Sequence, residues 1–232
     1  EAFIKNKTSD SKFIFTLDDG LKEHYWASKL LNEMGLETYI FAPTQPIIGN
    51  YIIHSNVIQY LITSKFLKEI YEYIKNYLKD AKVALSTIEK YKLNNVKNST
   101  WNEEMVFITN SLRYSIFGKK LTTLIFERYI SNKEKNNSKN LYMNFEELEE
   151  ISKLDKVLIG GHGSKSDILT ETNNLSEEID ESFNILDKLG VEKKYFSYPN
   201  GIYNEEIINK LKKRGFIKGF TTNYKESQSK NN

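Results

Sequence analysis

The residues of this chain that could carry out chemistry are gathered in three short polar motifs, each directly after an apolar run. They are Asp18-Asp19-Gly20, His162-Gly163-Ser164 and Pro199-Asn200-Gly201. Two adjacent carboxylates repel each other, and keeping both ionised takes a cation or a strong hydrogen-bond donor. One aspartate could therefore bind a divalent cation while the other deprotonates a water that the cation activates. Asp-Asp-Gly is also a common turn sequence, and the motif taken alone favours the turn.

Alternating strands and helices are expected to position these motifs. Short apolar runs predict the strands, and apolar residues at helical spacing predict the helices between them. The predicted strands are 12–17, 37–42, 156–160, 195–198 and 216–222, and the predicted helices are 22–34, 145–154, 175–189 and 204–214. This alternation is typical of an α/β fold with a parallel sheet. The motifs follow strands, at the edge where such folds build their sites.

A long helical segment interrupts the alternation. Within 50–140, the apolar residues of 57–62, 66–78 and 105–130 recur at helical spacing, and little resembles a strand. The polar tract 131–140 predicts a mobile loop at the end of this segment. We therefore expect one domain over residues 1–232, with 50–140 as a helical insertion after the second strand.

Composition and charge exclude several classes of function. The chain has 232 residues, and 39% of them are hydrophobic, which is enough for a core. Its 33 basic and 31 acidic side chains are interspersed, and a net charge of +2 gives no support to nucleic-acid binding. Without cysteine, the chain has no disulfide, thiolate metal site or cysteine nucleophile. No apolar run is long enough for a membrane helix and no signal-peptide pattern opens the chain, so we expect a soluble protein. The sequence begins at Glu1 rather than Met, so a leader or anchor could have been removed, and the localisation stays open.

Taken together, the motifs resemble those of the polysaccharide deacetylases, the carbohydrate esterases with a NodB homology domain. The first family motif is Thr-Phe-Asp-Asp-Gly, and the segment from Thr16 to Gly20 matches it with Leu17 in place of Phe. The second is Gly-x-His-[Ser/Thr/Gly]-x-x-His, and the segment that begins at Gly160 matches it up to Ser166, which stands at the second histidine.

The third family motif is Arg-x-Pro-[Tyr/Phe]-Gly. Pro199 and Gly201 match it, and Ser197 replaces the arginine that braces the catalytic aspartate in the family. The late Leu-x-His motif, which supplies the general acid in the family, has no match in this sequence. The resemblance covers 12–42 and about 141–222, on either side of the helical segment.

The resemblance implies a distorted (β/α) barrel, and it implies a role for each matching residue. Asp18 would be the catalytic base, and Asp19 and His162 would bind a divalent metal, which in this family is zinc. Two protein ligands rarely hold zinc tightly, so the replacement at Ser166 means that a third donor comes from elsewhere or that the site is impaired. Asp167 is the nearest carboxylate, and we expect it to be a loop or cap residue.

The resemblance also implies an oxyanion site and leaves the general acid open. A backbone N–H near Tyr198, in the turn with Pro199 and Gly201, would stabilise the oxyanion. His24, at the first turn of the predicted helix 22–34, could be the third ligand or the general acid, and it could equally be a solvated helix residue. His54 is expected to be structural.

The function that follows is a hydrolase that removes an N-acetyl or O-acetyl group from a sugar of a surface or cell-wall glycan. The resemblance places it in the cytoplasm or cell envelope of a bacterium, with an acetylated sugar as partner, no nucleic acid and no membrane span. The replacements at Ser166 and Ser197 keep an alternative open, a catalytically impaired carbohydrate-binding or assembly protein. A third alternative is a scaffold that dimerises through the apolar stripe of 66–78.

Overall fold

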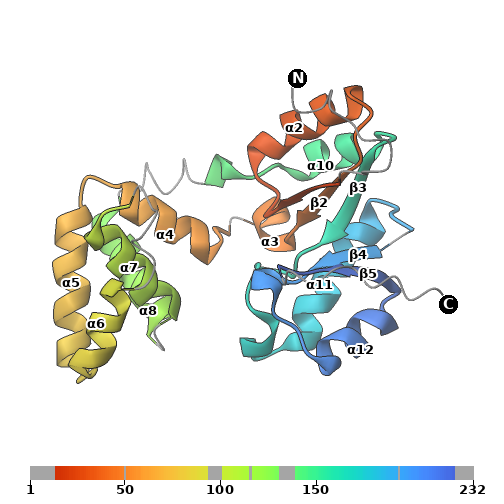
Figure 1. Cartoon of the computed structure of the whole chain (residues 1–232). Coiled ribbons are helices and arrows are strands. Elements are labelled where there is room, and N and C mark those ends of the chain that lie inside the picture. Colours follow the sequence, from red (N-terminus) through yellow and green to blue (C-terminus); the bar gives the residue numbers. More distant parts are fainter. Residues whose placement is uncertain are drawn as a thin grey trace, which may run out of the picture. The chain divides into compact units, whose positions relative to one another are not determined.

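The computed structural model describes residues 14–49, 51–93, 101–114, 117–130, 139–192 and 194–222. The chain divides into two units, which are described separately (Figure 1). The α/β unit comprises Glu1–Tyr51 and Asn140–Asn232, and the helical unit comprises Ile52–Lys139. Most of the predicted mobile loop, 131–138, lies outside the described residues.

The described part of the α/β unit contains a parallel sheet of five strands, which confirms the predicted α/β class. The strands lie side by side in chain order: β1 (Phe15–Asp18), β2 (Thr38–Ala42), β3 (Val157–Gly161), β4 (Lys194–Ser197) and β5 (Phe216–Phe220). All residues of β2 are buried, on both faces of the sheet. A strand covered on both faces has no polar alternation, and this explains the continuous apolar run in its sequence.

Four helices pack on this sheet, and a short helix, α3 (Thr44–Ile48), follows β2. The four are α2 (Lys22–Glu33), α10 (Phe145–Ser152), α11 (Leu175–Lys188) and α12 (Glu205–Lys213), with 3-10 turns at η1 (Lys139–Leu141), η2 (Leu169–Glu171) and η3 (Pro199–Gly201). Asn144, Asn174 and Asn204 cap α10, α11 and α12 by accepting a backbone N–H of the first turn. In a sheet whose strands follow chain order, right-handed crossovers place the connecting helices on one face.

The other face of the sheet is concave. The ring of Phe220 on β5 lies 5.0 Å from the ring of Tyr39 and 4.9 Å from that of Phe41, both on β2. In a flat sheet β2 and β5 would be about 14 Å apart, because β3 and β4 lie between them. Side chains of this size span such a gap only if the sheet curls. The contacts between these rings therefore indicate that the sheet is strongly curved.

Five helices make up the described part of the helical unit: α4 (His54–Thr63), α5 (Leu67–Asp80), α6 (Leu85–Leu93), α7 (Glu103–Tyr114) and α8 (Gly118–Tyr129). Ile70, Ile74 and Leu78 lie one turn apart on α5 and are fully buried in the core of this unit. The stripe of 66–78 is therefore used inside the unit, and it does not provide the dimer interface of the scaffold alternative.

His54 connects two helices of this unit and is partly buried. Its Nε2 lies 2.9 Å from Thr122 Oγ1, and the Thr122 hydroxyl donates to the carbonyl of Gly118 at 2.8 Å. Since that hydroxyl uses its only proton on the carbonyl, it accepts from His54. The histidine thus ties α4 to α8, which agrees with the structural role expected for it.

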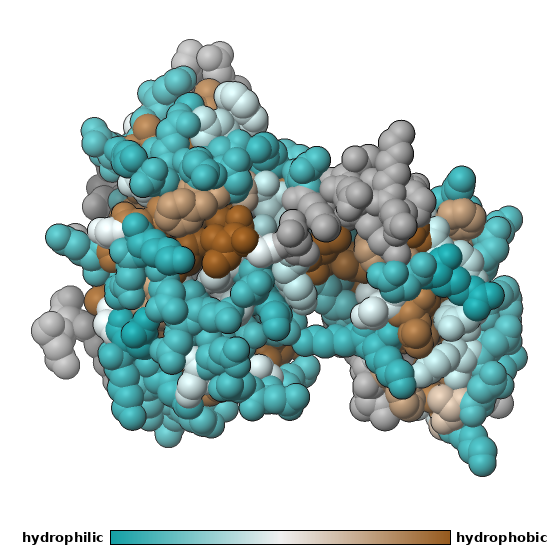
Figure 2. Space-filling model, turned by 180° about the vertical axis from the view of Figure 1, so that it is seen from behind, coloured by the Kyte–Doolittle hydropathy of each residue, from teal (hydrophilic) through white to brown (hydrophobic). Residues whose placement is uncertain are grey.

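The surface of both units is mostly hydrophilic, with apolar side chains in small patches (Figure 2). One exposed apolar stripe lies on α2, where Trp26, Leu30 and Met34 are one turn apart and are 66%, 58% and 44% exposed. The buried side of α2 is formed instead by Tyr25 and Ser28. None of the helices in the described residues is long and apolar enough to cross a bilayer.

Gly160 on β3 makes room for the concave face, and a side chain there should destabilise the fold. A Cβ atom at this position would lie 2.6 Å from the ring of Phe41 and 2.9 Å from the carbonyl oxygen of Tyr195. We expect Gly160→Val to lower the free energy of unfolding in urea by about 2 kcal/mol or more. Thr16→Ala, at an exposed position of β1, is the control and should change it by less than about 0.5 kcal/mol. Equal effects would contradict the close packing around Gly160 described here.

Candidate functional site

Polar side chains from three strand ends meet at the carboxyl edge of the sheet. Asp18 is the last residue of β1, Ser197 is the last residue of β4, and His162 directly follows β3. The sequence places each of them at the end of a strand. The curvature of the sheet then brings them into contact, together with Asp19 and Ser166 from the adjoining loops.

A hydrogen bond across the concave face fixes Asp18. The Ser197 hydroxyl donates to Asp18 Oδ2 at 3.2 Å. β1 and β4 are separated by β2 and β3, so a flat sheet would hold them about 14 Å apart. Ser197 is buried and Asp18 is exposed, so the serine orients a carboxylate that water can reach. Ser197 thus contacts the aspartate from the position that carries arginine in the polysaccharide deacetylases.

His162 directs its Nε2 atom toward Asp19. Its Nδ1 lies 2.9 Å from the backbone carbonyl of Ser197, and a carbonyl only accepts, so Nδ1 carries a proton. In the neutral ring, Nε2 is then an acceptor, and it lies 3.6 Å from Asp19 Oδ1. Two acceptors that face each other, one of them on a buried ring, need a cation or a proton between them. An Nδ1–H bonded to a carbonyl is also the usual arrangement of a metal-binding histidine.

Ser166 contacts the same oxygen of Asp19 as His162 does. Its hydroxyl donates to Asp19 Oδ1 at 3.0 Å. Both residues have left-handed backbone conformations, with φ of 72° at Asp19 and 60° at Ser166. Residues other than glycine adopt this conformation at a cost, and such residues concentrate at functional sites. The two turns therefore hold the carboxylate and the hydroxyl toward each other.

The side chains present fit one divalent cation but do not form a complete zinc site. Zinc bonds of about 2.0–2.2 Å at a tetrahedral angle separate two ligand atoms by about 3.4 Å. The observed distance of 3.6 Å between His162 Nε2 and Asp19 Oδ1 is close to this value. Among the described residues, no three His, Cys, Asp or Glu side chains are grouped to hold a metal. With two such ligands and the Ser166 hydroxyl, the site should bind zinc weakly.

His24 is a capping residue near the site. Its Nδ1 accepts the backbone N–H of Leu21 at 3.1 Å and so closes the first turn of α2. When the ring is neutral, its proton is on Nε2. Burial lowers the pKa of His24, and the negative charges of Asp19, Glu23 and Asp18 act in the opposite direction. His24 is therefore half-buried rather than solvated, and its Nδ1 is not available to a metal.

The turn after β4 departs from the predicted oxyanion site. The backbone N–H of Tyr198 donates to the carbonyl of Phe220 at 3.0 Å, as part of the pairing between β4 and β5. This N–H is not available to an oxyanion, so a donor in the turn Pro199–Gly201 would have to be another group. Gly201 has a φ of 71°, and its N–H closes the turn on the carbonyl of Tyr198 at 2.7 Å. Burial raises the pKa of the Tyr198 hydroxyl to about 12, so this group stays neutral.

Glu178 on α11 holds the loop that follows β3, and the sequence analysis missed this role. The residue is only 8% exposed, and its Oε2 accepts the backbone N–H groups of Ser164 at 3.0 Å and Lys165 at 3.3 Å. Burial raises the pKa of Glu178, although both hydrogen bonds oppose the shift. The sequence pattern could have indicated that Glu178 is buried, because it lies two helical turns before the buried Ile185, on the apolar face of α11.

A second set of contacts holds the same loop from α3 and from Glu181. The backbone N–H groups of Thr44 and Gln45 donate to the carbonyls of Gly163 at 3.3 Å and Ser164 at 2.8 Å. The carboxylate of Glu181 accepts from the Ser164 hydroxyl and, at 3.0 Å, from Gln45 Nε2. The loop between His162 and Ser166 is thus fixed on two sides, which supports the left-handed conformation at its end.

No family model matches the chain, and no curated protein matches it. The resemblance to polysaccharide deacetylases therefore rests on the three motifs and on the way in which the fold groups them. Of the residues singled out from the sequence, Asp18, Asp19, His162, Ser166 and Ser197 form one connected set. His24 lies beside this set, and the turn at Pro199 adjoins it through β4.

We predict that Glu178→Ala frees the loop after β3. The substitution leaves two backbone N–H groups without their acceptor, at about 1–3 kcal/mol each. Hydrogen exchange should therefore become faster at the amides of Ser164 and Lys165. Glu178→Gln keeps an oxygen for both groups and should have a much smaller effect, and Glu177→Gln, at an exposed position, is the control. Unchanged exchange in Glu178→Ala would contradict the role of this carboxylate.

Proposed function

We propose that the chain is a metal-dependent hydrolase of the polysaccharide deacetylase type, which removes an N-acetyl or O-acetyl group from a sugar of a surface or cell-wall glycan. The observation that carries the proposal is the pair of acceptors, His162 Nε2 and Asp19 Oδ1, that face each other at 3.6 Å next to Asp18. A turn cap needs no imidazole from another strand. A divalent cation, for which we propose zinc, accounts for this arrangement.

The fold that we propose is a distorted (β/α) barrel, with the helical unit inserted after β2. The chain order of the strands supports it, because successive right-handed crossovers leave one face of the sheet free to close on itself. The contact of Phe220 with Phe41 also supports it, since this contact requires strong curvature. In barrels of parallel strands, sites lie at the carboxyl ends of the strands, where Asp18 and His162 are found.

The chemistry would be hydrolysis of an acyl group. Asp19 and His162 would hold the cation, and a divalent cation supplies Lewis-acid activation of water when it is bound. Asp18, oriented by the Ser197 hydroxyl, would take the proton of the attacking water. The leaving amine or hydroxyl would take up the proton that Asp18 receives from the water as the bond to the acetyl carbon breaks, and His24 would donate a hydrogen bond to it through its Nε2–H.

The second candidate is a catalytically impaired protein that binds or assembles a glycan. The observation that favours it is the hydrogen bond from Ser166 to Asp19, which satisfies one carboxylate oxygen without a metal. The serine stands where the family has its second histidine, and Ser197 stands where the family has arginine. Zinc binding separates this candidate from the first.

Asp18→Asn should abolish hydrolysis and leave zinc binding and folding intact. An amide keeps the shape and the hydrogen bond with Ser197, but it does not accept a proton from water. Removal of such a base lowers the rate by about 100-fold or more. Release of acetate from an acetylated sugar oligomer in the presence of zinc measures the rate. Hydrolysis at the wild-type rate would contradict the role of Asp18, and loss of folding would point to a structural role.

Ser166→His should raise the affinity for zinc by about tenfold or more, because it supplies the third protein ligand that catalytic zinc sites have. Histidine also tolerates the left-handed conformation of this position. Competition with a chromogenic chelator measures the affinity. Ser166→Ala is the matched control, since it removes the same hydroxyl without adding a ligand. Equal affinities in the two variants would mean that the third ligand comes from elsewhere.

A further inference from the structure

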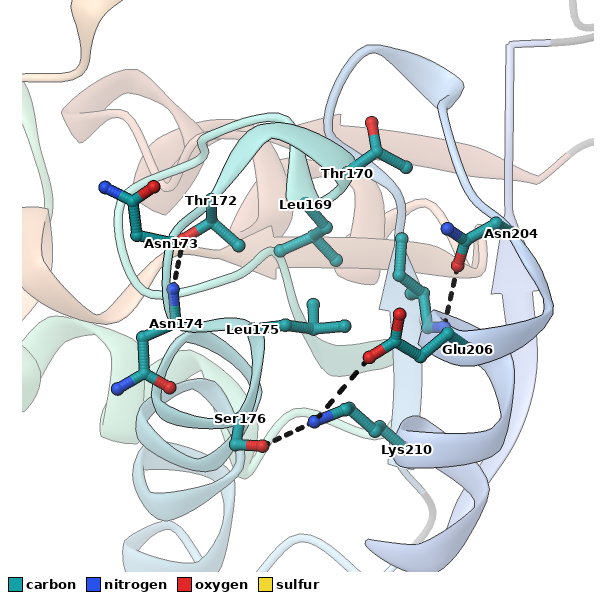
Figure 3. Close-up of a pocket in the computed structure, with 11 residues that line it drawn as sticks. Leu169, Thr170, Thr172, Asn173, Asn174, Leu175, Ser176, Asn204, Glu206 and Lys210 are labelled. Atoms are coloured by element: carbon teal, nitrogen blue, oxygen red, sulfur yellow. Dashed lines mark hydrogen bonds and ion pairs between the residues drawn. The ribbon is translucent and has the colours of Figure 1, made fainter.

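A polar pocket lies close to the candidate site, at the same edge of the sheet. Its volume is about 320 Å³, and η2 and the first turns of α11 and α12 form its walls (Figure 3). Leu169, the first residue of η2, is three residues beyond Ser166, so their Cα atoms are at most about 11 Å apart. The pocket is thus within reach of a sugar residue next to one bound at the candidate site.

The lining of the pocket is mostly polar. Leu169 and Ile207 lie beneath it and are almost completely buried, so they offer a ligand little apolar surface. Hydroxyl, amide and charged side chains surround them, among them Asn173, Ser176 and Lys210 (Figure 3). The volume is at the lower end of the range of about 300–1,000 Å³ for ligand pockets, so the pocket suits one ring rather than a long chain.

The lining favours a neutral ligand over an anion. The helix amides that would bind an anion are already capped: Asn174 accepts the N–H of Glu177 at 3.3 Å, and Asn204 accepts the N–H of Ile207 at 2.9 Å. The two charged side chains of the rim, Glu206 and Lys210, have opposite signs. The pocket therefore offers donors and acceptors without a net charge, which matches the hydroxyl groups of a sugar.

Lys210 is the group best placed to select such a ligand. Its ammonium donates to Ser176 Oγ at 2.6 Å and lies 3.9 Å from Glu206 Oε1 (Figure 3). An ammonium has three N–H donors, and these two partners use at most two of them. The contacts with α11 and within α12 hold the remaining donor at the rim of the pocket, where a sugar hydroxyl could accept from it.

We propose that this pocket binds a neutral sugar ring, and that it is the subsite for the glycan residue next to the acetylated one. The second part of this proposal, that the bound ring is next to the acetylated sugar, rests on the proposed function. The binding itself involves none of the candidate metal ligands, and it can be measured separately.

Amide chemical shifts of the isotope-labelled full chain, titrated with a soluble tetramer of N-acetylglucosamine, test the proposal. We expect saturable shifts at Asn173, Ser176 and Lys210, and none at these positions with inorganic phosphate. Lys210→Met and Asn173→Ala should each weaken binding by about fivefold to tenfold. Lys212→Met is the control, because Lys212 is exposed and two residues from Lys210, on the opposite side of α12. Absence of saturable shifts, saturation by phosphate, or binding unchanged in both variants would overturn the proposal.

The same titration on the double variant Asp19→Ala/His162→Ala separates this proposal from the proposed function. Binding at the pocket should persist there, with or without zinc. If the wild-type chain binds the tetramer at the pocket but hydrolyses no acetylated sugar, the subsite is supported and the hydrolase is not. If hydrolysis depends on Asp18 but the pocket binds no sugar, the subsite alone is wrong.

Discussion

The curvature of the parallel sheet is the constraint on which the candidate site depends. Phe220 on β5 packs against Tyr39 and Phe41 on β2, and the same curvature brings the end of β4 to the end of β1. Burial of Tyr39 and Phe41 contributes about 1.5–3 kcal/mol for each, and the partly buried ring of Phe220 packs against both across the concave face. Without this packing, Asp18 would lose its contact with Ser197, whereas His162 and Ser197 would stay together, because they follow the adjacent strands β3 and β4.

The loops that carry the polar groups are held by contacts from several elements, and this allows their strained conformations. Ser166 and Asp19 both have positive φ angles, which cost free energy in residues other than glycine. Glu178 on α11 and the first residues of α3 bind the loop after β3 from two sides. The rigid part of the fold thus pre-organises one carboxylate, one imidazole and one hydroxyl at a single point, as a binding site for a cation requires.

The sequence predicted the parts of this structure that depend on local patterns. Short apolar runs marked the strands, and the polar motifs after them marked the site edge of the sheet. Local patterns do not predict the contact of Ser197 with Asp18, because it depends on curvature set by aromatic residues far apart in the chain; only the resemblance, in which an arginine at this position braces the aspartate, points to it. Glu178 falls in the first turn of the predicted helix 175–189, and tertiary contacts bury it there. Likewise, 105–130 was read as one helical stretch, and the structure has α7 and α8 there.

We propose that His162 Nε2 and Asp19 Oδ1 face each other across a cation site rather than as a protonated ion pair. Crystals of the full chain grown with zinc, with diffraction recorded on both sides of the zinc absorption edge, test it most directly. The account predicts an anomalous peak about 2.0–2.2 Å from both atoms. No peak at this position, in crystals that bind zinc elsewhere, would contradict the claim and favour the impaired glycan-binding protein.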